Sequence, residues 1–394
     1  MVQDEQPSAK SMPHRRDLLQ CGGVAMIAGA ASLAAPQGVS AETGGARLRH
    51  PMVIDTLGGL GNPNLPAPAG AEDFASIDER AISDGHAAGL CAFNQTLGYV
   101  SGPADPFEYS VASIARWDDY IRRNPRNFIK VLGVADISEA GRSKRFGVIY
   151  GFQNGAMFGA DPGRVATFAR LGLRITQLTY NIHNQLGDGS MAPQNGGLSE
   201  LGRAMVAEIQ RNKVILDLSH SGEQTCLDAI AASNGPLVIS HTGCRAVADL
   251  PRNKTDSELR GIAEKGGCVG IYFMPFLAIG RQPTTQDLIA HIEHAIQVCG
   301  EDHVTIGTDG VLSAVDDMSA YFARLRVEVD QRKAAGISAT GERADIVPFL
   351  PDLQGADKFR RLADLLERRG HSPARIDKLL GENFLRCAGQ IWGG

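Results

Sequence analysis

The chain has 394 residues, of which 43% are hydrophobic and 46 are glycine, and its formal net charge at pH 7 is −5. This length is enough to bury a large core, and one barrel-sized domain with additions uses most of it. The acidic balance, together with the lack of any Lys/Arg cluster interleaved with aromatic residues, argues against nucleic acid as a partner.

The first residues have the pattern of an export signal. Paired arginines in "HRRDLLQ" (residues 14–20) precede an apolar stretch of small residues over 22–35, and "VSA" ends at Ala41. The pattern predicts a twin-arginine-type signal peptide over 1–41, export to the periplasm, and a single mature domain over 42–394. The apolar stretch is too short and glycine-rich to span a bilayer, so no transmembrane segment is expected after processing.

Six cysteines follow the leader, and most lie in apolar strand-like or helical runs without paired spacing. An exported protein could form disulfides, but this distribution predicts buried free thiols, and no CxxC metal-binding pair is present. The six are Cys91, Cys226, Cys244, Cys268, Cys299 and Cys387.

From Met52 onward, short apolar or β-branched runs alternate with longer amphipathic stretches, which predicts repeated βα units and a parallel sheet. Eight runs qualify as strands, and eight is the strand number of a (β/α)8 barrel. The expected strands are residues 51–55, 89–96, 146–154, 174–181, 214–220, 236–241, 266–274 and 303–309. The expected helices are residues 110–123, 162–171, 199–211, 223–233, 256–265 and 285–299.

Local signals add detail to this pattern. Ser199 and Asp256 are expected to cap the N-termini of their helices. Residues 187–197 are rich in glycine and polar side chains and follow a strand, so they are expected to form a loop on the catalytic face. Residues 359–392 have helical patterning with charged faces and a break at Gly370, and we expect them to cap the barrel.

Three of the expected strands end in a polar side chain that can bind a metal. The run "VILDLSH" ends at His220, "PLVISH" at His241 and "HVTIGTD" at Asp309. One histidine after an apolar run is usually structural, but a barrel enzyme builds its active site from the C-terminal ends of several strands. The three side chains are therefore expected to meet in an active site, and their types favour a metal-dependent hydrolase.

The spacing of "DLSH", "SH" and "GTD" resembles that of the membrane (renal) dipeptidase family of the amidohydrolase superfamily. The resemblance extends from Pro51 to the C-terminus and implies an α/β fold, a (β/α)8 TIM barrel of the metal-dependent hydrolase type with a C-terminal helical cap. Further matching stretches are "LTYNIHNQLGDG" at 178–189, "GLSELGRAMVAEIQRNKVILDLSHSGEQT" at 197–225, "PRNKTD" at 251–256 and "LLGENFLR" at 379–386.

By position, the resemblance implies roles for five side chains. His220 and His241 would bind the second, more buried zinc, and Arg252 would bind the terminal carboxylate of the substrate, although a loop salt bridge is the alternative for that arginine. Asp309 would take a proton from the attacking water and pass it to the leaving amine. Tyr180 lies in the strand where some members have a histidine near the scissile carbonyl, so it is a candidate substrate-binding residue.

The sequence departs from the family at three positions. The resemblance calls for a His-x-Asp pair after the first strand to hold the first zinc, but Leu57 and Gly59 occupy those positions. It also calls for a glutamate that bridges two ions, but Gln153 stands there, and an amide is a neutral, weak donor. Two close dications repel strongly without a bridging carboxylate. We therefore expect no first zinc and at most one ion, on His220 and His241, with Gln153, Asp309 or water completing its shell.

Other candidate residues stay open. Asp55 could replace a lost ligand, although a cap or loop hydrogen bond suits its position better. His183 follows a strand and could reach the site. Asn181 and Asp188 either contact substrate or order their loop.

The leading functional prediction is an exported dipeptidase-like hydrolase that cleaves a dipeptide or related small amide, with zinc as cofactor at one ion or none. The alternative is a metal-free or inactive relative that binds a small carboxylated ligand or assists maturation of another exported protein. A third reading keeps the barrel and gives it isomerase or lyase chemistry. A homodimer is left open.

Overall fold

The computed structural model describes residues 52–65 and 73–393. Within them, nine parallel strands form one sheet in the order β1-β2-β4-β5-β6-β7-β8-β9, and β3 pairs beside β4 off this path. The strands are β1 (Val53–Asp55), β2 (Leu90–Leu97), β3 (Phe128–Lys130), β4 (Phe146–Phe152), β5 (Leu173–Gln177), β6 (Ile215–Asp217), β7 (Val238–Thr242), β8 (Cys268–Ile271) and β9 (Val304–Ile306).

The two edge strands of this order meet and close the sheet. The Thr56 amide donates to the Ile306 carbonyl at 3.1 Å, and the Asp309 amide donates to the Leu57 carbonyl at 2.7 Å. A parallel bridge also pairs Gly59 with Val311. Eight consecutive strands therefore form the (β/α)8 barrel that the sequence pattern predicts.

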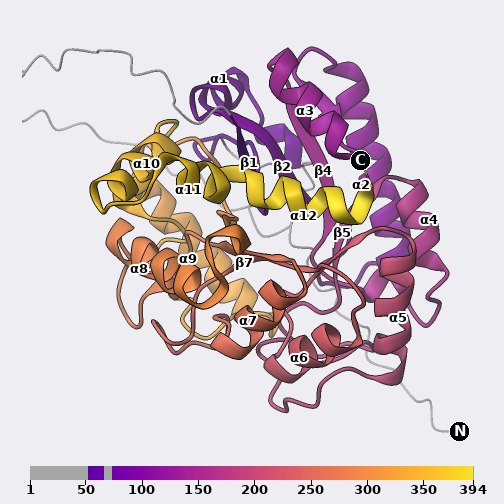
Figure 1. Ribbon diagram of the computed structural model, residues 1–394. Helices are drawn as coiled ribbons and strands as arrows, with labels where there is room; N and C mark the ends of the chain where they lie inside the picture. Colours follow the sequence, from indigo (N-terminus) through magenta and orange to yellow (C-terminus); the bar gives the residue numbers. More distant parts are fainter. Residues whose placement is uncertain (1–51, 66–72, 394) are drawn as a thin grey trace, which may run out of the picture.

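The helices alternate with the strands and surround them (Figure 1). Those before the last strand are α1 (Glu79–Ala87), α2 (Pro106–Arg123), α3 (Val134–Ser143), α4 (Arg164–Arg170), α5 (Glu200–Arg211), α6 (Glu223–Ala232), α7 (Asp256–Glu264) and α8 (Thr285–Cys299). After β9 come α9 (Met318–Ala334), α10 (Lys358–Arg368), α11 (Pro373–Asp377) and α12 (Asn383–Trp392).

The expected helix caps hold in one case and fail in the other. Ser199 caps α5, since its side chain accepts a hydrogen bond from the Gly202 amide. Asp256 is not a cap: Thr255 caps α7 and forms a capping box with Glu258. A threonine followed three residues later by a glutamate is the stronger N-terminal signal.

Four elements fall outside the segments expected from the sequence, namely β3, α1, α3 and α9. β3 has three residues, too few for a periodic pattern. Along α9, only Leu325 and Val329 are buried, so its sequence lacks a wide apolar stripe. These two residues form a small cluster of their own with Val347.

α12 closes the amino end of the barrel (Figure 1). The Trp392 indole donates to the Arg174 carbonyl at the start of β5, and Arg386 donates to the Gly266 carbonyl just before β8. Apolar side chains from inside the barrel pack on α12; they include Ile54, Ala92, Ile149, Ile175 and Ile215 with Phe384, Cys387 and Trp392. The expected helical cap is therefore present, and the opposite, carboxyl end of the strands is left to form the site.

All six cysteines of the described barrel are buried and free, as the sequence predicts. None of the helices in the described ranges combines the length and apolar character that crossing a bilayer requires. The expected signal peptide over 1–41 lies outside the described residues. The single-domain boundary at 42 stays a prediction.

Candidate active site

Two histidine rings meet at the carboxyl end of the barrel. His220 lies three residues beyond β6 and His241 lies within β7. Their Nε2 atoms are 3.0 Å apart, and both side chains are buried. Burial, reinforced by the positive charge of Arg252, lowers the pKa of both imidazoles well below the usual value, so both rings are neutral near pH 7.

The outer nitrogen of His220 is held by a side-chain amide. Asn181 donates through Nδ2 to the Ile337 carbonyl at 2.9 Å, which fixes the orientation of its amide group. Its Oδ1 therefore faces His220 Nδ1, at 2.6 Å, as an acceptor. This bond places the proton of His220 on Nδ1 and leaves a lone pair on Nε2.

The outer nitrogen of His241 is held in the same way by a hydroxyl. Ser240 Oγ lies 2.7 Å from His241 Nδ1 and donates its own proton to Asp217 at 2.5 Å, so it accepts from the ring. Both histidines thus carry lone pairs on Nε2, and these point at each other. A cation between the two atoms would relieve their repulsion, and fixing ligand tautomers by outer hydrogen bonds is typical of metal sites.

Asp217, the last residue of β6, is the centre of this support. Its carboxylate accepts hydrogen bonds from Gln177 Nε2 and from the amide and hydroxyl groups of both Ser219 and Ser240. Asp217 belongs to the same "DLSH" run as His220, but the sequence pattern alone predicts no role for it.

Replacing Asp217 with alanine should leave several buried donors without an acceptor and lower the free energy of unfolding by about 3–5 kcal/mol. Chemical denaturation of the variant beside wild type measures this loss. Asp249→Ala is the control, because that side chain is 85% exposed and its loss should change stability by less than about 0.5 kcal/mol. A loss equal to that of the control would show that the hydrogen bonds of Asp217 contribute little to the free energy of unfolding.

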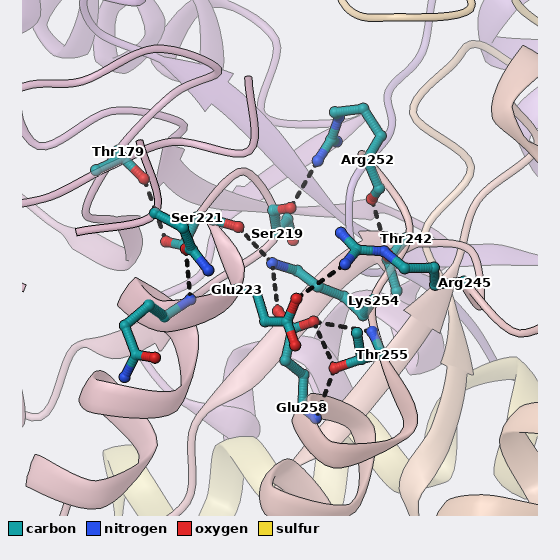
Figure 2. A network of polar contacts seen from close by, with 12 residues as sticks. Thr179, Ser219, Ser221, Glu223, Thr242, Arg245, Arg252, Lys254, Thr255 and Glu258 are labelled. Atoms are coloured by element: carbon teal, nitrogen blue, oxygen red, sulfur yellow. Dashed lines mark hydrogen bonds and ion pairs between the residues drawn. The ribbon is translucent and has the colours of Figure 1, made fainter. Parts of the chain in front are cut away.

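The segment after β7 donates hydrogen bonds to Ser219 and Ser221, the two residues that flank His220 in the sequence (Figure 2). Arg252 donates through Nη1 to the Ser219 carbonyl at 2.6 Å, and Lys254 donates to the Ser221 carbonyl at 2.5 Å. Lys254 also forms a buried ion pair with Glu258 at 3.0 Å. Arg252 is only 2% exposed and its Nη2 lies 3.3 Å from His220 Nε2, so in this structure the guanidinium also faces the lone pair of that ring.

A cavity of about 310 Å³ opens beside His220, whereas His241 is fully buried and is not among the residues that line it. It brings together the sequence-predicted residues Gln153, Tyr180, His220, Arg252 and Asp309. The Tyr180 ring stacks on His220 with ring centroids 4.1 Å apart. The outer wall comes from α9 and the segment after it, including Tyr321, Leu325, Glu328, Val329, Arg332, Glu342, Ile346 and Phe349.

His183 and Asp55 do not join the histidine pair. The His183 side chain is 68% exposed and bonds Asp188 at 2.7 Å, which orders their loop. Asp55 is buried and accepts hydrogen bonds from the amide and hydroxyl of Thr308 and from the Leu57 amide. Burial raises the pKa of Asp55 to about 7 despite these bonds.

The donor set does not fit two ions. Leu57 is buried and Gly59 has no side chain. Among the residues that the structure describes, no group of three or more His, Cys, Asp or Glu side chains is arranged to hold a metal. The imidazoles of His220 and His241 do fit one ion: zinc bonds of about 2.0–2.1 Å at a tetrahedral angle separate two nitrogens by about 3.3 Å, close to the 3.0 Å found here.

The family model for membrane dipeptidases, Peptidase family M19, matches residues 96–323, which is more than half of the chain. The chain belongs to this family. It is a dipeptidase-like hydrolase with the barrel of the amidohydrolase type, as the sequence resemblance implies.

The chain is also similar to individual proteins. A solved amidohydrolase from Pseudomonas aeruginosa is 30% identical, with a TM-score of 0.72 and coverage of 87% of this chain and 97% of that one. A Klebsiella pneumoniae protein described as an uncharacterized protein in the pqqA 5′ region is 27% identical over 74% of this chain and 99% of its own length. Dipeptidase verJ from Clonostachys rogersoniana is 32% identical over 48% of this chain and 50% of that protein.

Proposed function

We propose that this membrane dipeptidase family member hydrolyses a dipeptide or related small amide with one zinc ion held by His220 and His241. The observation that carries the proposal is the 3.0 Å approach of two buried imidazole Nε2 atoms, of which that of His220 belongs to the wall of a ligand-sized cavity. The cavity volume of about 310 Å³ lies at the lower end of the range for small-molecule pockets, about 300–1,000 Å³, which suits a dipeptide.

Gln153 is the proposed third ligand. It lines the same cavity, and its Nε2 donates to Thr96 at 2.6 Å, which leaves Oε1 as its metal-binding atom. When bound, zinc would act as a Lewis acid and lower the pKa of a water molecule. Two neutral imidazoles and an amide bind zinc more weakly than a set that contains thiolates or carboxylates.

The protein's own residues perform the remaining chemistry. Asp309 accepts a proton from the attacking water and delivers it to the departing amine, so that one carboxylate serves as base and then as acid. Arg252 binds the terminal carboxylate of the substrate, which requires its Nη2 to leave His220 Nε2. Tyr180 lies against His220 and contacts the scissile carbonyl.

The proposal includes export. The paired arginines before a short apolar stretch support a twin-arginine leader and a periplasmic location.

Zinc-loaded mature protein should hydrolyse a panel of unblocked dipeptides, with release of free amino acids measured by chromatography. Peptides whose C-terminal carboxylate is replaced by an amide should be cleaved at least about tenfold more slowly, because they lose the contact with Arg252. Protein freed of zinc by a chelator is the control. The absence of turnover on every dipeptide with a full complement of zinc would refute the proposed function.

A further inference from the structure

Lys358, the first residue of α10, is a buried amine that lines the cavity. It is 7% exposed, and its Nζ donates to the Val311 carbonyl at 2.8 Å. Burial lowers the pKa of Lys358 to about 8, so most of the amine is protonated at neutral pH. Because Val311 pairs with Gly59, the ammonium lies beside the strand end at which the resemblance calls for the first ion.

No carboxylate neutralises this ammonium directly. Asp55 attracts Lys358, and its carboxylate accepts hydrogen bonds from Thr308 and Leu57, but Lys358 forms no ion pair within 4.0 Å among the described residues. The Val311 carbonyl accepts a hydrogen bond from one of the three N–H groups of the ammonium. A buried charge with unused donors beside a cavity favours an anionic ligand.

Other cations of the cavity wall do have acidic partners. Arg332 pairs with Glu342 at 2.7 Å, and Arg343 pairs with Asp345 at 2.6 Å. Within the described ranges, neither Arg252 nor Lys358 has a carboxylate partner.

The two cations lie on different sides of the cavity. Arg252 is bound to the Ser219 carbonyl after β6, whereas Lys358 is bound to the Val311 carbonyl after β9, three strands further round the barrel. Neighbouring strands are about 4.8 Å apart, so the two charges are separated by a distance on the order of 10 Å. One carboxylate group is too small to contact both.

We infer that Lys358 binds a second carboxylate of the substrate, so that the preferred dipeptide carries an acidic side chain. This inference deepens the proposed function and rests on it for the identity of the ligand as a dipeptide. Arg252 binds the terminal carboxylate and Lys358 binds the side-chain carboxylate. A purely structural role, in which Lys358 only joins α10 to the segment after β9, would give no preference between acidic and neutral substrates.

The test compares two substrates that differ by a single group. Glutamylalanine and glutaminylalanine have the same shape, but only the first has a side-chain carboxylate. Wild-type protein should bind and cleave glutamylalanine about 10–100-fold better, because the amide oxygen of glutamine still accepts a hydrogen bond from Lys358 but lacks the negative charge that strengthens it. In Lys358→Met, which keeps the volume of the side chain, that ratio should fall to about one.

Lys333→Met on α9 is the matched control, since Lys333 is exposed and does not line the cavity, and it should keep the wild-type ratio. Calorimetric binding of both dipeptides is measured beside turnover. Preferential binding of glutamylalanine without turnover would leave the Lys358 inference standing while the hydrolytic function failed. Equal affinity of wild type for both dipeptides, or an unchanged ratio in Lys358→Met, would overturn the inference.

Discussion

Asp309→Asn should lower kcat for dipeptide hydrolysis by about 10²–10⁴-fold, because an amide cannot accept the proton of the attacking water. Asparagine can adopt the backbone conformation of Asp309. Asp309 has φ of 53°, in the left-handed region, and asparagine is among the few residues that adopt this conformation readily. The bond from its amide to the Leu57 carbonyl does not involve the side chain. The variant should therefore fold normally, and steady-state kinetics together with a thermal melt measure the two effects.

A control and a second readout separate proton transfer from metal binding. Asp119→Asn on α2 removes a carboxylate from an ion-paired surface position and should leave kcat unchanged. The zinc content of Asp309→Asn should equal that of wild type if Asp309 acts on protons alone. A variant that retains kcat within about threefold would remove Asp309 from the proposed mechanism.

The half of the site that contains His220 and His241 could be predicted from the sequence because its residues follow the periodicity of the barrel. Parallel strands bring their carboxyl ends to one edge, so a polar residue that ends each of several apolar runs must lie near the others. This holds for His220, His241 and Asp309, whose separation in the chain is large. The absence of the His-x-Asp pair could be predicted as well, because Leu57 and Gly59 follow directly after the first expected strand.

The rest of the site could not be predicted from local pattern. Lys358 stands before "FRRLADLLERR", where charged residues surround it and predict an exposed helix face, yet tertiary contacts bury it. The wall formed by α9 depends on how a weakly amphipathic helix packs after β9, and strand periodicity says nothing about that. The role of Asn181 could not be predicted because it depends on the position of the His220 ring, 39 residues away in the chain.

These differences bear on how the cavity is charged. Where the resemblance calls for an ion between the first strand and the last, this chain has a leucine, a glycine and a nearby ammonium. A fixed ammonium can bind an anionic group, but unlike zinc it cannot activate a water molecule. In the proposed mechanism, catalytic chemistry is therefore concentrated on the side of His220 and His241, and the side of Lys358 is left for substrate recognition.

The double variant His220→Ala, His241→Ala should lose its zinc and its hydrolytic activity together. Wild-type protein should contain about one zinc per chain by elemental analysis, and the variant should contain none. The reason is that His220 and His241 supply the two imidazole ligands of the proposed zinc site, and both are removed. Truncating two buried rings also costs packing energy, so near-ultraviolet circular dichroism must first show that the variant is folded.

His294→Ala is the matched control, since that ring pairs with Asp256 away from the cavity and its loss should leave zinc and turnover unchanged. Two zinc ions per chain in wild type would contradict the single-ion site and require ligands that replace those missing at Leu57 and Gly59. Full turnover in zinc-free wild type would contradict metal-assisted hydrolysis. In that case the guanidinium of Arg252, and no metal ion, would stabilise the lone pair of His220 Nε2. One ion per chain, with zinc and turnover both lost in the double variant, would instead mean that a single ion on His220 and His241 suffices for hydrolysis.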